Sequence, residues 1–246
     1  MPLAVTEFSL PAAELAPPLP AWELHVHTRF SDGRAEVEEY VQRALETGIR
    51  RLAFTEHCEP DKVRPGWFPV YLRKVRETAR YYRGRLEIVC GLEVPAADFQ
   101  GGLVATGEML AQVDFVLGCA HRYPGLEGRR VRDLSLAEAV ELEYRTLMAL
   151  AGSPRVQAIA HLGGTCRRYA GPFPLELAAE VIGKAARHGV AIELNSRYHD
   201  PRYLAGLLAI CRREGARVTW GSDAHTTGEL GQAHRALERI LGGKPE

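Results

Sequence analysis

The stretch WELHVHTRFSDG, residues 22–33, places two histidines one residue apart at the end of a short apolar run. Side chains two residues apart on a strand point to the same face, so His25 and His27 are expected to project together. Asp32 and Gly33 form a turn signal a few residues further on. This stretch predicts a β-strand that ends in a pair of imidazoles suited to chelating a metal ion.

The rest of the chain repeats one unit, in which a short apolar stretch is followed by a loop and a helical pattern. The predicted strands are 22–26, 51–56, 86–92, 114–120, 155–160, 190–195 and 216–221, and helical patterns cover 37–45, 68–83, 103–112, 136–152, 174–188, 201–214 and 229–241. This alternation is typical of parallel strands joined by crossover helices. Seven such units favour a closed or nearly closed α/β barrel, with an open doubly wound sheet as the alternative.

The chain divides into a short arm and one domain. Residues 1–20, with five prolines and no basic flank, predict an irregular N-terminal arm that is either loose or laid against the domain, and not a signal peptide. Residues 21–246 contain no clear linker, so we expect a single barrel domain there. No apolar run approaches the roughly 20 residues that span a bilayer, which argues against a membrane protein.

Charge and cysteine content narrow the classes of function. Lys and Arg together number 31, as do Asp and Glu, so no excess of positive charge draws the protein onto long nucleic acids. The five cysteines are odd in number and form no C-x-x-C pair. This usage indicates a reducing compartment, the cytoplasm, and argues against a disulfide framework or a structural zinc site.

Six histidines and three carboxylates share one kind of position, at or just past the end of a predicted strand. They are His25, His27, Asp32, His57, Glu93, His121, His161, Asp223 and His225. The carboxyl ends of parallel strands open on one rim, so these side chains are expected to converge. Without a cation such packing would be costly, because unpaired polar groups and adjacent carboxylates are expensive to desolvate. The sequence therefore predicts a metal cluster.

The ligand types constrain the metal. Mixed imidazole and carboxylate ligands suit zinc, manganese or iron(II). At about four to six ligands per ion, nine ligands imply two or three divalent ions, with Glu93 or Asp223 able to bridge. The other histidines, His188, His199 and His234, are assigned no function.

The successive motifs HVHTRFSDG, FTEH, GLE, AHR, AHLGG and GSDAH resemble those of the polymerase and histidinol phosphatase (PHP) superfamily, over about residues 22–241. The resemblance implies a distorted (β/α)7 TIM-like barrel with a trinuclear metal centre. Carried over by position, His25, His27, Glu93 and Asp223 would hold one ion. Glu93, His57 and His121, with Asp32 nearby, would complete the second and third ions together with His161 and His225.

The resemblance also implies a reaction, the hydrolysis of a phosphate monoester by a hydroxide that bridges two ions, with Glu93, Asp223 and His225 as catalytic residues. Within the superfamily the chain is similar to the histidinol-phosphate phosphatase branch, because TEH replaces TDH and no sizeable insertion is present. That branch converts L-histidinol phosphate and water to L-histidinol and phosphate, in histidine biosynthesis. The stretch CAHRYPGLEG departs from the more apolar sequence usual after this histidine.

Arginines that follow the strand ends are candidates for binding the small phosphorylated substrate, because the planar guanidinium fork matches phosphate geometry. They are Arg122, Arg167, Arg168 and Arg197.

Two alternatives remain open. The first is a nucleotide or oligonucleotide phosphoesterase, or an exonuclease, of the same superfamily. The second is an amidohydrolase-type barrel, which also begins with H-x-H but usually carries a lysine at the end of strand four, where this chain has His121. A non-catalytic structural role, as when such a domain has lost its metal ligands, is disfavoured, since no ligand position is missing.

Overall fold

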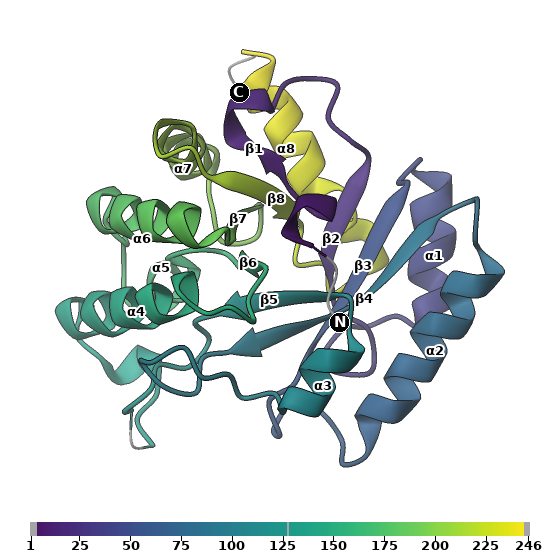
Figure 1. Ribbon diagram of the computed structural model, residues 1–246, viewed down its shortest axis with the longest axis horizontal. Coiled ribbons are helices and arrows are strands. Elements are labelled where there is room, and N and C mark those ends of the chain that lie inside the picture. Colours follow the sequence, from purple (N-terminus) through teal and green to yellow (C-terminus); the bar gives the residue numbers. More distant parts are fainter. Residues whose placement is uncertain (1–3, 127, 244–246) are drawn as a thin grey trace.

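The computed structural model describes residues 4–126 and 128–243, and its centre is one eight-stranded sheet in the order β1-β8-β7-β6-β5-β4-β3-β2. The parallel strands are β2 (Trp22–Val26), β3 (Arg51–His57), β4 (Glu87–Pro95), β5 (Phe115–Cys119), β6 (Ala158–Ile159), β7 (Ala191–Asn195) and β8 (Arg217–Gly221). All seven predicted strands and their parallel direction are confirmed (Figure 1).

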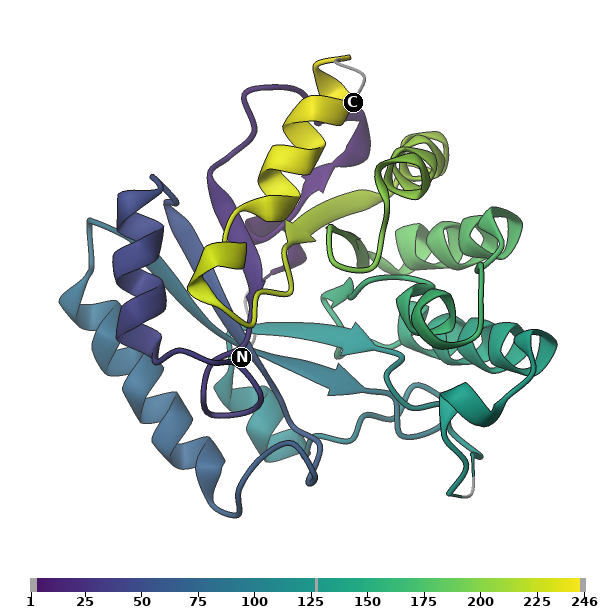
Figure 2. The ribbon, with the colours of Figure 1, turned by 180° about the vertical axis from the view of Figure 1, so that it is seen from behind.

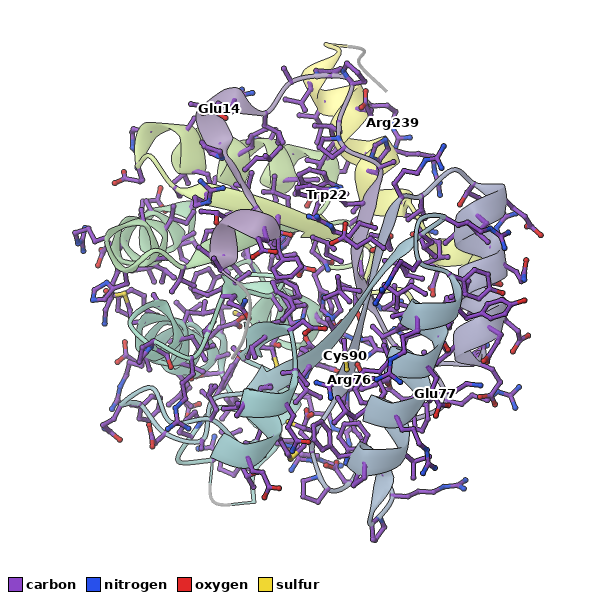
Figure 3. All side chains as sticks on the ribbon, turned by 45° about the vertical axis from the view of Figure 1, so that its right-hand side comes forward. Glu14, Trp22, Arg76, Glu77, Cys90 and Arg239 are labelled. Atoms are coloured by element: carbon purple, nitrogen blue, oxygen red, sulfur yellow. The ribbon has the colours of Figure 1, made fainter. Side chains whose placement is uncertain are left out.

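The sheet curls until β2 meets the segment that follows β8, at the carboxyl ends of the strands. Beyond β2, the His27 N–H donates to the carbonyl of Ala224 at 2.9 Å, and the Ala224 N–H donates to the carbonyl of His25 at 3.0 Å. Trp22, labelled in Figure 3, stacks on Trp220 of β8 with ring centroids 5.1 Å apart. The distorted α/β barrel is therefore confirmed, and the open doubly wound sheet is wrong.

The α-helices cover the outside of the curled sheet (Figures 1 and 2). They are α1 (Val37–Glu46), α2 (Trp67–Tyr81), α3 (Gly107–Gln112), α4 (Leu136–Ala151), α5 (Gly164–Tyr169), α6 (Leu175–His188), α7 (Pro201–Arg213) and α8 (Gln232–Leu241). Short 3-10 helices are η1 (Val5–Glu7), η2 (Ala12–Glu14), η3 (Val131–Asp133) and η4 (Thr227–Glu229). The sequence did not predict α5, because six residues are too few to show a helical apolar period.

Two predicted helices begin later than expected. Helix α3 starts after Thr106, whose side chain accepts from the N–H of Met109 at 3.2 Å, and α8 starts after Gly231, which adopts a left-handed conformation with φ 75°. Both boundaries are set by capping residues and not by the apolar period, which explains the difference.

The described part of the arm, residues 4–20, lies against the barrel. Strand β1 (Leu10–Pro11) pairs antiparallel with β8, opposite Val218 and Arg217. Phe8 is buried and packs on Phe115 of β5, with ring centroids 4.9 Å apart. The arm thus inserts an aromatic ring into the core cluster that fills the barrel interior. The first three residues of the predicted arm and the last three of the predicted domain lie outside the described residues.

Two further features bear on the sequence predictions. All five cysteines are buried and free. Within the described ranges, no helix is long and apolar enough to cross a membrane.

Candidate metal centre

The nine predicted ligand residues come together at the carboxyl rim of the barrel, with the Glu93 carboxylate at the centre. Oε1 of Glu93 lies 2.7 Å from Nε2 of His161 and 3.1 Å from Nε2 of His121. Its other oxygen, Oε2, lies 3.0 Å from Nδ1 of His57 and 3.5 Å from Nε2 of His27. One buried carboxylate at the end of β4 therefore contacts rings from four other strand ends.

The histidine pair that ends β2 forms a second grouping with Asp223. Nε2 of His25 and Nε2 of His27 lie 3.0 Å apart, as the period of a strand predicts for side chains on one face. Oδ1 of Asp223 lies 3.1 Å from Nε2 of His27 and 3.6 Å from Nε2 of His25. Glu93 adjoins the same pair, so two imidazoles and two carboxylates surround one position.

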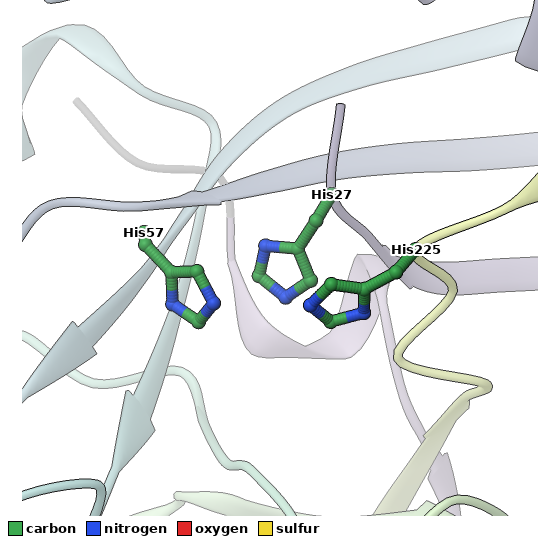
Figure 4. A group of neighbouring side chains, drawn as sticks. All are labelled: His27, His57 and His225. Carbon is green, nitrogen blue, oxygen red and sulfur yellow. The ribbon is translucent and has the colours of Figure 1, made fainter. Parts of the chain in front are cut away.

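A third grouping lies nearer the opening. Oδ1 of Asp32 is 3.1 Å from Nε2 of His225 and 3.3 Å from Nε2 of His57. Figure 4 shows the rings of His27, His57 and His225 turned toward one another from three segments of the chain. Asp32 reaches this place because the loop after β2 turns tightly at Gly33, where a Cβ would lie only 2.0 Å from the carbonyl oxygen of His27.

Local backbone strain accompanies two of these residues. His161 and Asp223 adopt positive φ values of 27° and 51°, which are unfavourable for residues other than glycine. Such strain persists only where the surroundings hold it in place, and it clusters at functional sites. The Glu193 carboxylate accepts the His161 N–H at 2.8 Å and so helps to hold that turn.

The hydrogen bonding of the cluster is incomplete in a manner that suits a cation. Among the described residues, four of its buried atoms form no hydrogen bond of suitable geometry, even though Nδ1 of His57 and Oε2 of Glu93 face each other at 3.0 Å: His27 Nδ1, His57 Nδ1, Glu93 Oε2 and Asp223 Oδ1. Ring nitrogens and carboxylate oxygens of three groups approach within 4.8 Å of one another, namely His25, His27 and Glu93; His27, His57 and His225; and His57, Glu93 and His121. Buried polar atoms are normally paired, so the residues fit divalent cations.

Attraction between rings and carboxylates dominates the electrostatics. Burial alone would raise the pKa of Glu93, but nearby imidazoles, His121 foremost, hold it well below its usual range. Burial also opposes ionisation of Asp223, and the imidazole pair after β2 nevertheless lowers the pKa of that carboxyl. The pKa of His27 is lowered well below its usual value by burial and by the charge of His57. His27 is therefore neutral near pH 7, with a lone pair that can bind a metal.

Three residues of the cluster were missed by the sequence interpretation. Glu193 on β7 lies 2.7 Å from Nδ1 of His25, and Glu59 lies 3.3 Å from Nδ1 of His121. Lys62 places Nζ 2.8 Å from Nε2 of His57. A carboxylate inside the apolar stretch VAIELN was the available signal for Glu193, whereas the loop that carries Glu59 and Lys62 has no period that could have indicated their positions.

A cavity of about 390 Å³ opens over the cluster, and three of the four predicted arginines line it: Arg122, Arg168 and Arg197. Arg168 donates to the Tyr198 hydroxyl at 3.1 Å, and the ring of Tyr198 packs on His161. Arg167 does not line this cavity. Its guanidinium pairs with Asp200 and lies over the ring of Tyr203, 4.0 Å from the centroid.

The fold and the cluster together define a class, the α/β barrels that carry a cluster of metal-ligand residues at the carboxyl rim. The chain belongs to the PHP domain family, which matches residues 23–197. A probable phosphatase of Acetivibrio thermocellus is 28% identical over 225 residues, covering 89% of this chain and 85% of that protein. A probable histidinol-phosphatase of Deinococcus radiodurans is 29% identical over 232 residues, covering 84% of this chain and 87% of that protein.

Solved structures agree with the fold. The histidinol phosphate phosphatase of Lactococcus lactis, in complex with zinc, L-histidinol and phosphate, has a TM-score of 0.70 at 19% identity, covering 90% of this chain and 92% of that one. The putative histidinol phosphatase of Listeria monocytogenes also has a TM-score of 0.70, at 16% identity and with 87% and 98% coverage. At these identities the structures show a shared fold. Family and relatives define the chain as a phosphatase-like hydrolase of the PHP family.

Proposed function

We propose that this chain is a metal-dependent phosphoric monoester hydrolase and that its substrate is L-histidinol phosphate. The observation that carries the proposal is the convergence of nine imidazoles and carboxylates, with Glu93 at their centre, under a cavity lined by arginines. Support for the substrate comes from the probable histidinol-phosphatase among the relatives and from the histidinol phosphatases that share the fold.

The contacts suggest how the ligands would be shared among two or three divalent ions. His25, His27, Glu93 and Asp223 would hold the first ion, His121 and His161 with Glu93 the second, and Asp32, His57 and His225 the outermost. Bound ions of this kind supply an acidified water and neutralise charge on the phosphoryl oxygens. Glu93, placed between the first two groups, is the residue that would bridge them.

The chain's own residues would bind and orient the phosphate. Arg168 forms no ion pair with a carboxylate of the described residues. Its guanidinium donates to the Tyr198 hydroxyl and has further N–H groups that can bind phosphoryl oxygens. Arg197 is held by Glu229 at 3.1 Å and by the carbonyl of Asp223 at 3.2 Å, which fixes it beside the cluster. Glu93, Asp223 and His225 remain the proposed catalytic residues. Asp223 and His225 line the cavity, and Glu93 contacts His57 and His121, which also line it.

A second candidate function, nucleotide or oligonucleotide hydrolysis, is favoured by a neighbouring cavity. This cavity has a volume of about 750 Å³, adjoins His121, and is lined in part by Arg122, Arg129, Arg130 and Arg132. Such a surface suits a substrate with additional phosphates. Its lining includes residues of the stretch CAHRYPGLEG, which departs from the sequence usual in histidinol phosphatases.

The test is metal analysis of the purified protein followed by phosphate-release assays after reconstitution with manganese, iron or zinc. Histidinol phosphate, mononucleotides and short oligonucleotides are compared by kcat/KM. We expect tightly bound metal and the highest kcat/KM with histidinol phosphate. Fewer than one bound ion per chain, or no phosphate release from any of these compounds, would contradict the proposal. A higher kcat/KM with nucleotides would favour the second candidate.

A further inference from the structure

Lys62 is the one lysine of the described residues that lines the cavity over the cluster. It belongs to the loop that follows β3, five residues after His57. Its Nζ lies 2.8 Å from Nε2 of His57 and 3.3 Å from Oδ2 of Asp32, and its side chain is 31% exposed. The ammonium group therefore sits within the outermost of the three ligand groupings and also faces the cavity.

The contact with His57 excludes a metal ion from the same ring nitrogen. A lysine ammonium has donors and no acceptor, so Nε2 of His57 must accept with its only lone pair. An ion held by Asp32, His57 and His225 would need that same lone pair. Asp32 likewise offers one oxygen to Nε2 of His225 and the other to Nζ. Lys62 and a third ion thus compete for the same groups.

The charge of the site favours the lysine in this competition. Five carboxylates lie within 3.3 Å of a ring nitrogen of the cluster: Asp32, Glu59, Glu93, Glu193 and Asp223. Two divalent ions and one ammonium neutralise five negative charges. A third divalent ion beside Lys62 would leave uncompensated positive charge in a largely buried site, which is costly.

We propose that the Lys62 ammonium takes the place of the third ion, so that the centre holds two divalent ions and Lys62 is the third cation that the phosphoryl group meets. This inference rests on the proposed function, since it concerns how the same centre is charged. Its distinguishing consequence is that the number of ions bound per chain depends on Lys62, although Lys62 itself does not bind metal.

The experiment measures metal content after desalting, and the dissociation constant of each ion by titration with zinc and with manganese. Lys62→Met keeps the length of the side chain and removes its charge, whereas Lys62→Arg keeps the charge. Lys74→Met is the matched control, because Lys74 pairs with Glu38 in a half-exposed ion pair between α2 and α1. Circular dichroism verifies that each variant is folded.

We expect two ions in the wild type, in Lys62→Arg and in Lys74→Met, and three in Lys62→Met, with the third ion bound about 100-fold more tightly than to the wild type. Three tight ions in the wild type, or only two in a folded Lys62→Met, would overturn the proposal. If Lys62→Met does not fold, the titration of the wild type decides, and a third ion bound at about micromolar concentration or below overturns it. Two ions without phosphate release would contradict the proposed function and still support the placement of Lys62, whereas a wild type without tight metal would contradict both.

Discussion

Oε1 of Glu193 lies 2.7 Å from Nδ1 of His25, and both side chains are fully buried inside the barrel. Since a carboxylate only accepts hydrogen bonds, Nδ1 of His25 carries the proton and Nε2 presents its lone pair to the centre. The same carboxylate accepts the His161 N–H through Oε2. One residue of β7 thereby orients two candidate ligands, one on β2 and one just after β6.

Glu193→Gln should weaken metal binding about 10- to 100-fold, because the amide can donate to Nδ1 and stabilise the wrong tautomer of His25. The measurement is competition of the loaded protein with a chelator of known affinity. Glu176→Gln, an exposed position on α6, is the control and should bind metal as the wild type does. Equal affinity in the Glu193 variant would rule out an orienting role.

Asp223→Ala should abolish turnover while leaving the barrel folded. Asp223 lies 3.1 Å from Nε2 of His27, and removal of a charged ligand should cost several kcal/mol of transition-state stabilisation, or about 1000-fold in kcat. Phosphate release and circular dichroism give the two readouts. Full activity in this variant would remove Asp223 from the site.

Arg168→Ala should raise KM for the phosphorylated substrate about ten-fold, since a charge-assisted hydrogen bond to phosphate is lost. Arg167→Ala is the comparison, and a smaller effect is expected because Arg167 is engaged by Asp200 and Tyr203 away from the cavity. Steady-state kinetics give KM for both variants and show which arginine binds the phosphate. A larger effect of Arg167 would show that the phosphate binds beside Asp200 and Tyr203 and not in the cavity over the cluster.

The buried carboxyl of Glu143, on α4, should make the free energy of unfolding depend on pH. Its buried carboxylate accepts from the Tyr123 hydroxyl at 2.7 Å, and burial raises its pKa to about 7. Between the usual glutamate pKa and about pH 7 the folded chain keeps this proton and the unfolded chain loses it. The free energy of unfolding should therefore fall as pH rises through this window, by on the order of 3 kcal/mol. Urea unfolding at about pH 5 and about pH 8 measures the change.

Glu143→Gln isolates this contribution, because glutamine has no proton to release in that range. The fall in stability between the two pH values should be smaller in the variant than in the wild type. An identical pH dependence in both proteins would show that other groups are responsible.

Phe8→Ala should destabilise the barrel by about 3 to 5 kcal/mol, because it opens a cavity next to Phe115. Thermal or urea unfolding provides the measurement. Val70→Ala, at a side chain that is 46% exposed, should change stability by less than about 0.5 kcal/mol. A similarly small effect at Phe8 would mean that the arm contributes little to the fold.

Much of the site could be predicted because strand geometry is local. The pairing of His25 with His27 requires only the two-residue period of β2, and the shared rim requires only that the strands be parallel. Helix boundaries were less predictable where a single residue decided them, as Gly231 does for α8. The arm offered no period at all, so its pairing with β8 and the burial of Phe8 appeared only in the structure.

The sequence by itself determined the alternating strands and helices, the barrel class and the nine ligand-type residues, because each follows from spacing along the chain. Only the tertiary structure decided which groups touch. It placed Glu193 behind His25, brought Lys62 to His57, and turned Arg167 away from the cavity. These contacts join residues on different strands and loops, and their distances depend on how the sheet curls and how the loops fold, which no local pattern encodes.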